Sequence, residues 1–237
     1  MILSREVRPN WSTISKITFR FIALYFWIYI FFIFAGRGLF ESLFAWIGRD
    51  ILHLEGRLEY FSTGSGDTTM GYVSFFTGIV FTAIGTMIWS FFDRKRPSYN
   101  QLFYWMIVIL RVFLIFYMFT YGFVKVFKAQ FPGPSLVRLL QPLGDMSPMG
   151  LAWTYMGHSE GFNMFVGFME VLGGLLLIPR KTLTLGAFIT MGVMIQVAMM
   201  NLFYDIPVKL FSIHLIAMAA VIFLADWKQQ YQYFEKL

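Results

Sequence analysis

One arginine lies inside an otherwise uncharged stretch of the chain, and its chemistry needs an explanation. Between Leu102 and Val124 the only charged residue is Arg111. A charged side chain at the centre of a bilayer costs roughly 3 kcal/mol on insertion scales. The rise of 1.5 Å per helical residue places Arg111 about 13 Å into this stretch, too deep for its guanidinium to reach water easily. We therefore expect Arg111 to have a buried partner.

Glu170 is the partner that the sequence predicts for Arg111. It follows Phe162 by eight residues, or about 12 Å of helix, in an apolar stretch that would run in the opposite direction. The two side chains would then lie at the same level of the membrane and form a buried ion pair. Asn163 and Gly167 share a helical face with Glu170, and a small residue there lets another helix approach closely.

Two interpretations of this polar core stay open. The ion pair could be structural and fix the register of two helices. It could also line a polar cavity for a lipid headgroup, a quinone carbonyl or a proton, since ionisable residues inside membranes are often functional. The candidate residues for either role are Arg111, Glu170, Lys125, Tyr121 and Asn163.

A second set of polar residues gathers near the ends of the last two apolar stretches. A structural interpretation makes Asp205 and Lys209 a salt bridge in the loop, and His214 a hydrogen-bonded packing residue. A functional interpretation makes the set a small polar pocket that opens outward, beneath a proline-rich segment carrying Asp145, His158 and Glu160. The residues of this outer polar cluster are Asn201, Asp205, Lys209 and His214, with Tyr204 and Ser212 beside them.

No motif in the sequence points to a bound cofactor. The chain has no cysteine, which excludes disulfides and thiol-relay chemistry. Its three histidines lie on dissimilar segments, which disfavours a haem site, and no metal, phosphate-loop, dinucleotide or nucleophile-elbow motif is present. We predict no cofactor or metal, with a quinone as the possible exception. A protein without catalytic activity of its own is favoured.

The elements that must position these residues are membrane-spanning helices. Of the 237 residues 58% are hydrophobic and only 14% are charged, against about 25% charged in soluble domains. The apolar segments approach the length needed to cross a bilayer and lack strand-like alternation, which predicts an all-α membrane protein. The six predicted transmembrane helices cover about Ile17–Gly36, Met70–Phe92, Leu102–Val124, Phe162–Ile178, Leu183–Phe203 and Val208–Ala225.

Lysine and arginine are concentrated in two short connections, DRKRP at 93–97 and PRKT at 179–182. Short cytoplasmic loops are rich in these residues, so both termini are predicted to be cytoplasmic, in a bacterial inner membrane. The net charge of +6 is then explained by topology, and no nucleic-acid partner is expected.

The two longer connections would lie outside. Residues 37–69 mix charges with apolar residues before STGSGDTT, which predicts an interfacial amphipathic helix followed by a loop. In residues 129–161, Pro134 can open a short helix through LVRLLQ, and Ser147 with Pro148 is a good start for a second helix. These short helices would form a lid or re-entrant element.

Two motifs resemble the DoxX/DoxD family. RVFLIFYMFTYGFVKVF contains Arg111, Gly122 and Lys125, and GFMEVLGGLLLIPRKTLTLGA places Glu170 before a glycine pair and a basic turn. The resemblance covers about residues 102–228. It implies a DoxX-like four-helix bundle at 102–237, preceded by a two-span extension at 1–101, with Arg111, Lys125 and Glu170 as the family-like polar positions. It also implies association with membrane oxidoreductase systems, including thiosulfate:quinone oxidoreductase subunits.

Three functions fit these observations. The first is an accessory subunit of a membrane redox or envelope-maintenance system, with an intramembrane pocket for a lipid- or quinone-like ligand. The second is a non-enzymatic assembly factor or chaperone that binds transmembrane segments of a partner. The third, a small-solute transporter, is disfavoured because no inverted repeat is visible. The expected partners are membrane lipids, with other membrane subunits or a second copy of the chain.

Overall fold

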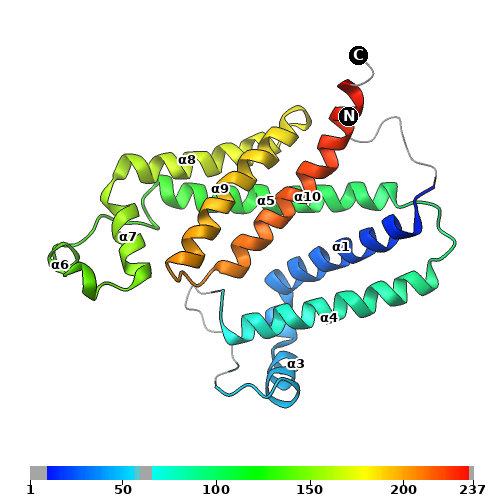
Figure 1. Ribbon diagram of the computed structural model, residues 1–237, viewed down its shortest axis with the longest axis horizontal. Coiled ribbons are helices and arrows are strands. Elements are labelled where there is room, and N and C mark those ends of the chain that lie inside the picture. Colours follow the sequence, from blue (N-terminus) through cyan, green and yellow to red (C-terminus); the bar gives the residue numbers. More distant parts are fainter. Residues whose placement is uncertain (1–9, 57, 59–65, 235–237) are drawn as a thin grey trace. The chain divides into compact units, whose positions relative to one another are not determined.

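Helices make up the regular structure of the computed structural model, which describes residues 10–56, 58 and 66–234 (Figure 1). In chain order they are α1 (Thr13–Phe31), α2 (Arg37–Leu39), α3 (Glu41–Trp46), α4 (Thr69–Phe92), α5 (Asn100–Val126), α6 (Leu136–Leu140), α7 (Pro148–His158), α8 (Glu160–Leu177), α9 (Leu183–Phe203) and α10 (Lys209–Phe234). Single π-helical turns occur at Phe32–Gly36 and Ile47–Ile51, and 3-10 turns at Leu143–Asp145 and Arg180–Thr182.

Within the described residues, five helices are long and apolar enough to cross a membrane: α1 with its π-helical extension, α4, α5, α8 and α9. All five coincide with predicted spans. The sixth predicted span lies in α10, but the apolar part of α10 that the structure describes, Lys209–Ala225, is shorter than the others. The chain is an α-helical, multi-pass membrane protein.

Side-chain caps start several of these helices. The Thr68 hydroxyl accepts from the Gly71 amide at 3.0 Å, and Ser147 accepts from the Gly150 amide at 3.1 Å. Such caps satisfy amides that have no partner inside the helix. The prediction that Ser147 and Pro148 open a helix is therefore confirmed. The short helix α6 begins at Leu136, two residues after Pro134, because the Ser135 side chain caps it.

The chain divides into two compact units, and the division falls inside α5, between Met106 and Ile107. The sequence predicted a boundary between residues 101 and 102. In the N-terminal unit, α1 and α4 run side by side (Figure 1).

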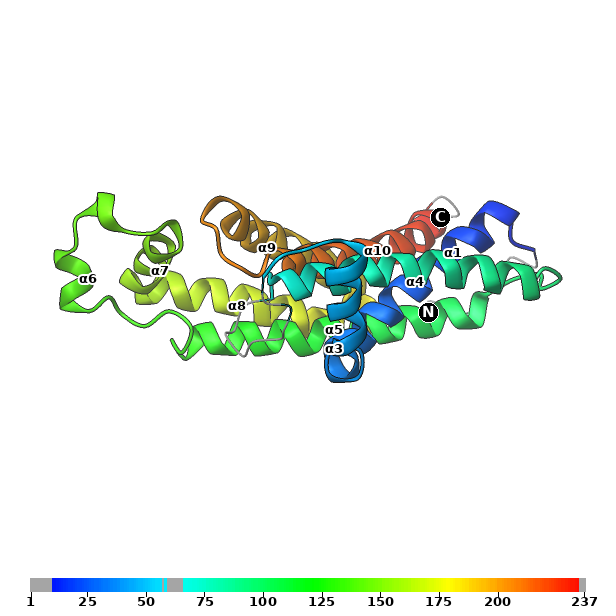
Figure 2. The same ribbon diagram turned by 90° about the horizontal axis from the view of Figure 1, so that it is seen from below.

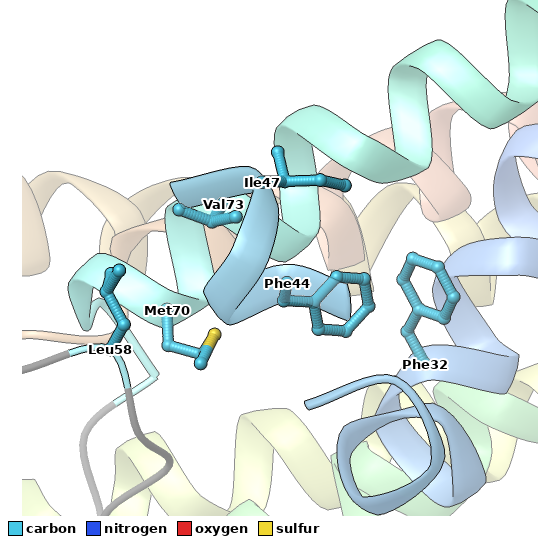
Figure 3. Close-up of a cluster of buried hydrophobic side chains, with 6 residues drawn as sticks. All are labelled: Phe32, Phe44, Ile47, Leu58, Met70 and Val73. Carbon is cyan, nitrogen blue, oxygen red and sulfur yellow. The ribbon is translucent and has the colours of Figure 1, made fainter. Parts of the chain in front are cut away.

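Helix α3 packs where α1 ends and α4 begins, and it contributes Phe44 to a buried apolar cluster (Figure 3). The predicted interfacial helix of residues 37–69 corresponds to α2, α3 and the π-helical turn after them. Half of the loop STGSGDTT predicted to follow, residues 62–65, lies outside the described residues. The cluster consists of Phe32, Phe44, Ile47, Leu58, Met70 and Val73.

In the C-terminal unit, α5, α8, α9 and α10 contact one another in that order. Glycine positions bring α5 against α8, and α8 against α9. Helices α9 and α10 are joined by the hydrogen bond from Asn201 to Ser212. The contact of Phe211 with Tyr117, at 4.7 Å between ring centroids, returns from α10 to α5. The short helices α6 and α7 lie together near the beginning of α8 (Figure 2).

Candidate functional site

The centre of the candidate site is a buried ion pair between α5 and α8. The Nζ atom of Lys125 lies 2.8 Å from both Glu170 carboxylate oxygens. Glu170 has no exposed surface and Lys125 is 5% exposed. Both ions are thus removed from solvent while paired with each other, and both lie on helices long enough to cross a membrane.

Two glycines explain why α5 and α8 come this close. A Cβ atom on Gly122 would lie 2.8 Å from the Gly167 carbonyl oxygen, and one on Gly167 would lie 2.7 Å from the Gly122 carbonyl oxygen. The two backbones therefore touch, as small residues allow in membrane helix packing. Lys125 and Glu170 each follow one of these glycines by three residues, so they share its helical face.

Aromatic rings cover one side of the ion pair. The Lys125 Nζ atom lies 5.5 Å from the centroid of the Tyr121 ring, within cation–π distance. Tyr121 in turn lies 6.0 Å from the rings of Tyr117 and Phe211. The predicted polar core residues Lys125, Glu170 and Tyr121 are therefore brought together.

Arg111 does not take the place that the sequence predicted, because Lys125 is the cation that pairs with Glu170. The Arg111 Nε atom donates to the Leu177 carbonyl at 2.5 Å, and its Nη2 atom donates to the Ile178 carbonyl. These carbonyls lie at the end of α8, where a helix has unsatisfied acceptors and partial negative charge. The guanidinium therefore caps α8.

The direction of helical side chains explains this correction. Side chains in a helix point back toward its N-terminus. On α5 that direction carries Lys125 toward Glu170 and carries Arg111 away from it, toward the end of α8. Leu177 lies seven residues beyond Glu170, or about 10 Å along the helix. Depth counted from the predicted ends of the spans favoured Arg111, because Lys125 lies one residue beyond the predicted span Leu102–Val124.

Asn163 lies on the same face of α8 as Glu170 and is only 1% exposed. Its Nδ2 atom donates to the Phe131 carbonyl at 3.2 Å. Its Oδ1 atom accepts no hydrogen bond within the described residues, and the same is true of Gln130 Oε1. A buried acceptor without a donor is costly. This end of α8 therefore offers two acceptors that a ligand or water could use.

The outer polar cluster is held by contacts among α9, α10 and the turn between them. The Asn201 Nδ2 atom donates to Ser212 Oγ at 3.1 Å. Lys209 pairs with Asp205 at 2.7 Å, and His214 Nδ1 lies 2.5 Å from the Leu210 carbonyl of its own helix. These contacts agree with the structural interpretation, in which Asp205 and Lys209 form a salt bridge and His214 is a hydrogen-bonded packing residue.

The proline-rich segment of residues 129–161 borders a groove rather than a polar pocket. The groove has a volume of about 440 Å³ and runs between α7 and the start of α8. Its predicted residue His158 lines it, while Glu160 pairs with Lys128 at 2.5 Å. Most of the groove surface is apolar. The lining residues are Leu151, Thr154, Tyr155, His158, Ser159 and Phe162.

A buried arginine network in the N-terminal unit was missed by the sequence analysis. Arg20 is 3% exposed, and its Nε atom donates to the Tyr99 hydroxyl at 2.9 Å. Its Nη1 atom donates to Ser90 at 2.9 Å, and its Nη2 atom to the Asp93 carbonyl at 2.8 Å. No role was predicted for Arg20. Its place inside the first apolar stretch was the signal that could have distinguished it.

The Tyr99 hydroxyl extends this network by donating to Asp93 Oδ2 at 2.7 Å. That hydrogen bond lowers the pKa of the Asp93 carboxyl, with a further contribution from the Trp89 indole. Burial, and then the same hydrogen bond, raises the pKa of the Tyr99 hydroxyl. The network therefore ties the turn between α4 and α5 to the side of α1.

The fold and this site together define a class: an α-helical, multi-pass membrane protein whose helices enclose a buried lysine–glutamate pair. Over 125 residues the chain is 34% identical to a protein of Bacillus subtilis (strain 168) described as uncharacterized protein YwoB, and the aligned part covers 49% of this chain and 73% of that relative. The chain belongs to the family of YwoB. No protein-family model and no solved structure matches the chain.

Proposed function

We propose that this protein binds the polar head of a lipid- or quinone-like molecule at the Lys125–Glu170 pair, as an accessory subunit of a membrane redox or envelope-maintenance system. The observation that carries the proposal is the burial of this pair between two membrane-crossing helices. Removing two charges from water is costly, and well-packed apolar residues would often be equally stable there. Stability alone therefore gives a weak reason for a buried pair.

The pair retains hydrogen-bonding capacity for a ligand. A lysine ammonium has three N–H groups, and the bonds to Glu170 use two of them. The third can donate to a carbonyl or phosphate oxygen. A carboxylate can accept more than one hydrogen bond per oxygen, so Glu170 can also accept from a hydroxyl. A lipid or quinone head that carries both a hydrogen-bond acceptor and a hydroxyl group can therefore bind both members of this pair.

The accessory role rests on the resemblance to the DoxX/DoxD family. The contacts of α5, α8, α9 and α10 support a four-helix bundle with α10 as a sixth span, after a two-span extension. The proposed location is a bacterial inner membrane with both termini cytoplasmic. The proposed partners are membrane lipids, with other membrane subunits or a second copy of the chain.

The test is to identify molecules that co-purify with the full-length protein. The protein is isolated in a mild detergent, and bound lipids and quinones are extracted and quantified by mass spectrometry. We expect about one amphiphile per chain in the native protein. The double variant Lys125→Met with Glu170→Met should lose it while remaining folded, because it leaves no unpaired buried charge.

The matched control is Lys128→Met, which removes a partly exposed lysine that pairs with the exposed Glu160. This variant should retain the bound molecule. Retention of the same molecule by the Lys125→Met/Glu170→Met protein would contradict the proposal and leave the pair with a structural role. Recovery of a stoichiometric membrane protein without any bound amphiphile would favour the assembly-factor function instead.

A further inference from the structure

The turn between α4 and α5 presents a run of exposed basic side chains. Arg94, Lys95 and Arg96 are all exposed, and Asp93 is the one acidic residue beside them. Arg96 faces back toward the turn, with its Nη1 atom 3.9 Å from Asp93 Oδ2 and its guanidinium 5.0 Å from the Tyr99 ring. Within the described part of the chain, Arg94 and Lys95 take part in no ion pair.

The turn is held in place from beneath. The Asp93 carbonyl accepts from Arg20, and its carboxylate accepts from Tyr99 and from Trp89. Arg20 is buried and reaches the turn from α1, so two helices fix the backbone from which the basic side chains extend. A fixed backbone reduces the conformational entropy lost when those side chains bind a ligand.

Apolar rings lie directly beside the basic residues. Phe91 is 61% exposed and Phe92 is 79% exposed, at the end of a helix long enough to cross a membrane. The Arg94 guanidinium lies 4.5 Å from the centroid of the Phe91 ring. Positive charge and exposed aromatic surface therefore adjoin each other at one end of α4.

We propose that this turn binds an anionic phospholipid, with its phosphate at Arg94 and Lys95 and its acyl chains against Phe91 and Phe92. Charge complementarity selects the anionic headgroup. The exposed rings favour a lipid over soluble phosphate, because only a lipid has acyl chains that can contact them. This site lies outside the polar core, so it does not depend on the function proposed above.

Native mass spectrometry of the full-length protein in detergent tests the proposal directly. Phosphatidylglycerol and phosphatidylcholine with identical acyl chains are titrated separately, and the population of each lipid-bound state is measured. We expect phosphatidylglycerol to bind the native protein roughly 25-fold more tightly than phosphatidylcholine. A basic residue near a membrane contributes roughly a factor of five to anionic-lipid binding. The variant Arg94→Gln with Lys95→Gln should therefore lose roughly 25-fold for phosphatidylglycerol and little for phosphatidylcholine.

The matched control is Arg180→Gln with Lys181→Gln, which removes two charges from the other short basic turn. It should retain tight binding of the first phosphatidylglycerol molecule. Equal losses in the two variants would overturn the proposal, because any pair of basic residues would then suffice. Displacement of the lipid by millimolar inorganic phosphate would also overturn it, since the site would then bind a soluble anion.

Discussion

At the scale of single residues, the Lys125–Glu170 pair should behave as an all-or-none unit. Each ion is stabilised mainly by the other, because both are buried. Removing one partner of such a pair leaves an uncompensated charge and costs about 3 to 5 kcal/mol. We expect Lys125→Met and Glu170→Met to lower the unfolding temperature in detergent strongly. Combining the two should recover most of the loss. A double variant as unstable as the two single variants together would show that the ions act independently.

The Asp93–Tyr99 hydrogen bond should make stability depend on pH at both extremes. The folded-state pKa of Asp93 is lowered from its ordinary 3.8, so its contribution to stability is present above that pH and is lost as the pH falls. The folded-state pKa of Tyr99 is raised from its ordinary 10.0, so its contribution is present below that pH and is lost as the pH rises.

Replacing Tyr99 with phenylalanine should therefore reduce the unfolding temperature most at about pH 5 to 9. The difference from the native protein should narrow below and above this range, because the native protein loses the same stabilisation there. Thermal unfolding in detergent at a series of pH values measures this difference. Tyr155→Phe, at an exposed position on α7, serves as the control and should follow the native curve. A difference that stays constant with pH would exclude the hydrogen bond as its source.

The candidate site shows which residue-scale features a sequence can predict. Burial of Glu170 follows from its position in an apolar stretch, and so does the need for a cation. The choice between Arg111 and Lys125 depends on where α5 and α8 touch and on the direction of each side chain. Gly122 and Gly167 set that contact, and their pairing across two helices has no signature in either stretch alone.

At the scale of elements, the helices follow from apolar length and capping chemistry. The predicted spans differ from α4, α5, α8 and α9 by at most two residues at each end. Ser147 and Pro148 predicted the start of α7 because an N-cap is a local property. The π-helical turn after α1 was not predicted, since Phe32–Gly36 is as apolar as the helix before it. The role of Arg20 was missed for a related reason, because its partners come from the end of α4 and from the turn after it.

The glycine contact between α5 and α8 gives an element-scale prediction. A methyl group on Gly122 would approach Val171 Cγ2 to 2.7 Å and the Gly167 carbonyl oxygen to 2.8 Å. Helix backbones cannot relax at such distances without moving apart. We expect Gly122→Ala to destabilise the protein by about 1 to 3 kcal/mol. It should also loosen the Lys125–Glu170 pair, which depends on the same contact.

Gly161→Ala is the matched control on α8, where a Cβ atom would meet nothing within 4 Å. Alanine is a better helix former than glycine by about 1 kcal/mol, so this variant should be neutral or slightly more stable. Unfolding in detergent compares the two variants. Equal stability of Gly122→Ala and the native protein would mean that α5 and α8 do not touch at this position in the membrane.

At the scale of the whole molecule, the distribution of basic residues should set the orientation in the membrane. The turns at 93–97 and 179–182 are short and carry five lysine and arginine residues, which predicts a cytoplasmic location for both. Helix α5 is a single helix of 27 residues between the first of these turns and the segment that contains α6 and α7. Since it crosses the membrane once, that segment should lie on the opposite side.

The absence of cysteine from the chain allows this orientation to be tested without background labelling. Gly144→Cys and Lys95→Cys place single thiols on the two sides of α5, at an exposed position in each case. A membrane-impermeant maleimide added to intact spheroplasts should label Gly144→Cys and leave Lys95→Cys unlabelled until the membrane is permeabilised. Lys181→Cys should behave like Lys95→Cys, because α5 and α8 cross in opposite directions. Labelling of all three thiols in intact spheroplasts would contradict a multi-pass topology, and the reverse pattern would place the basic turns outside.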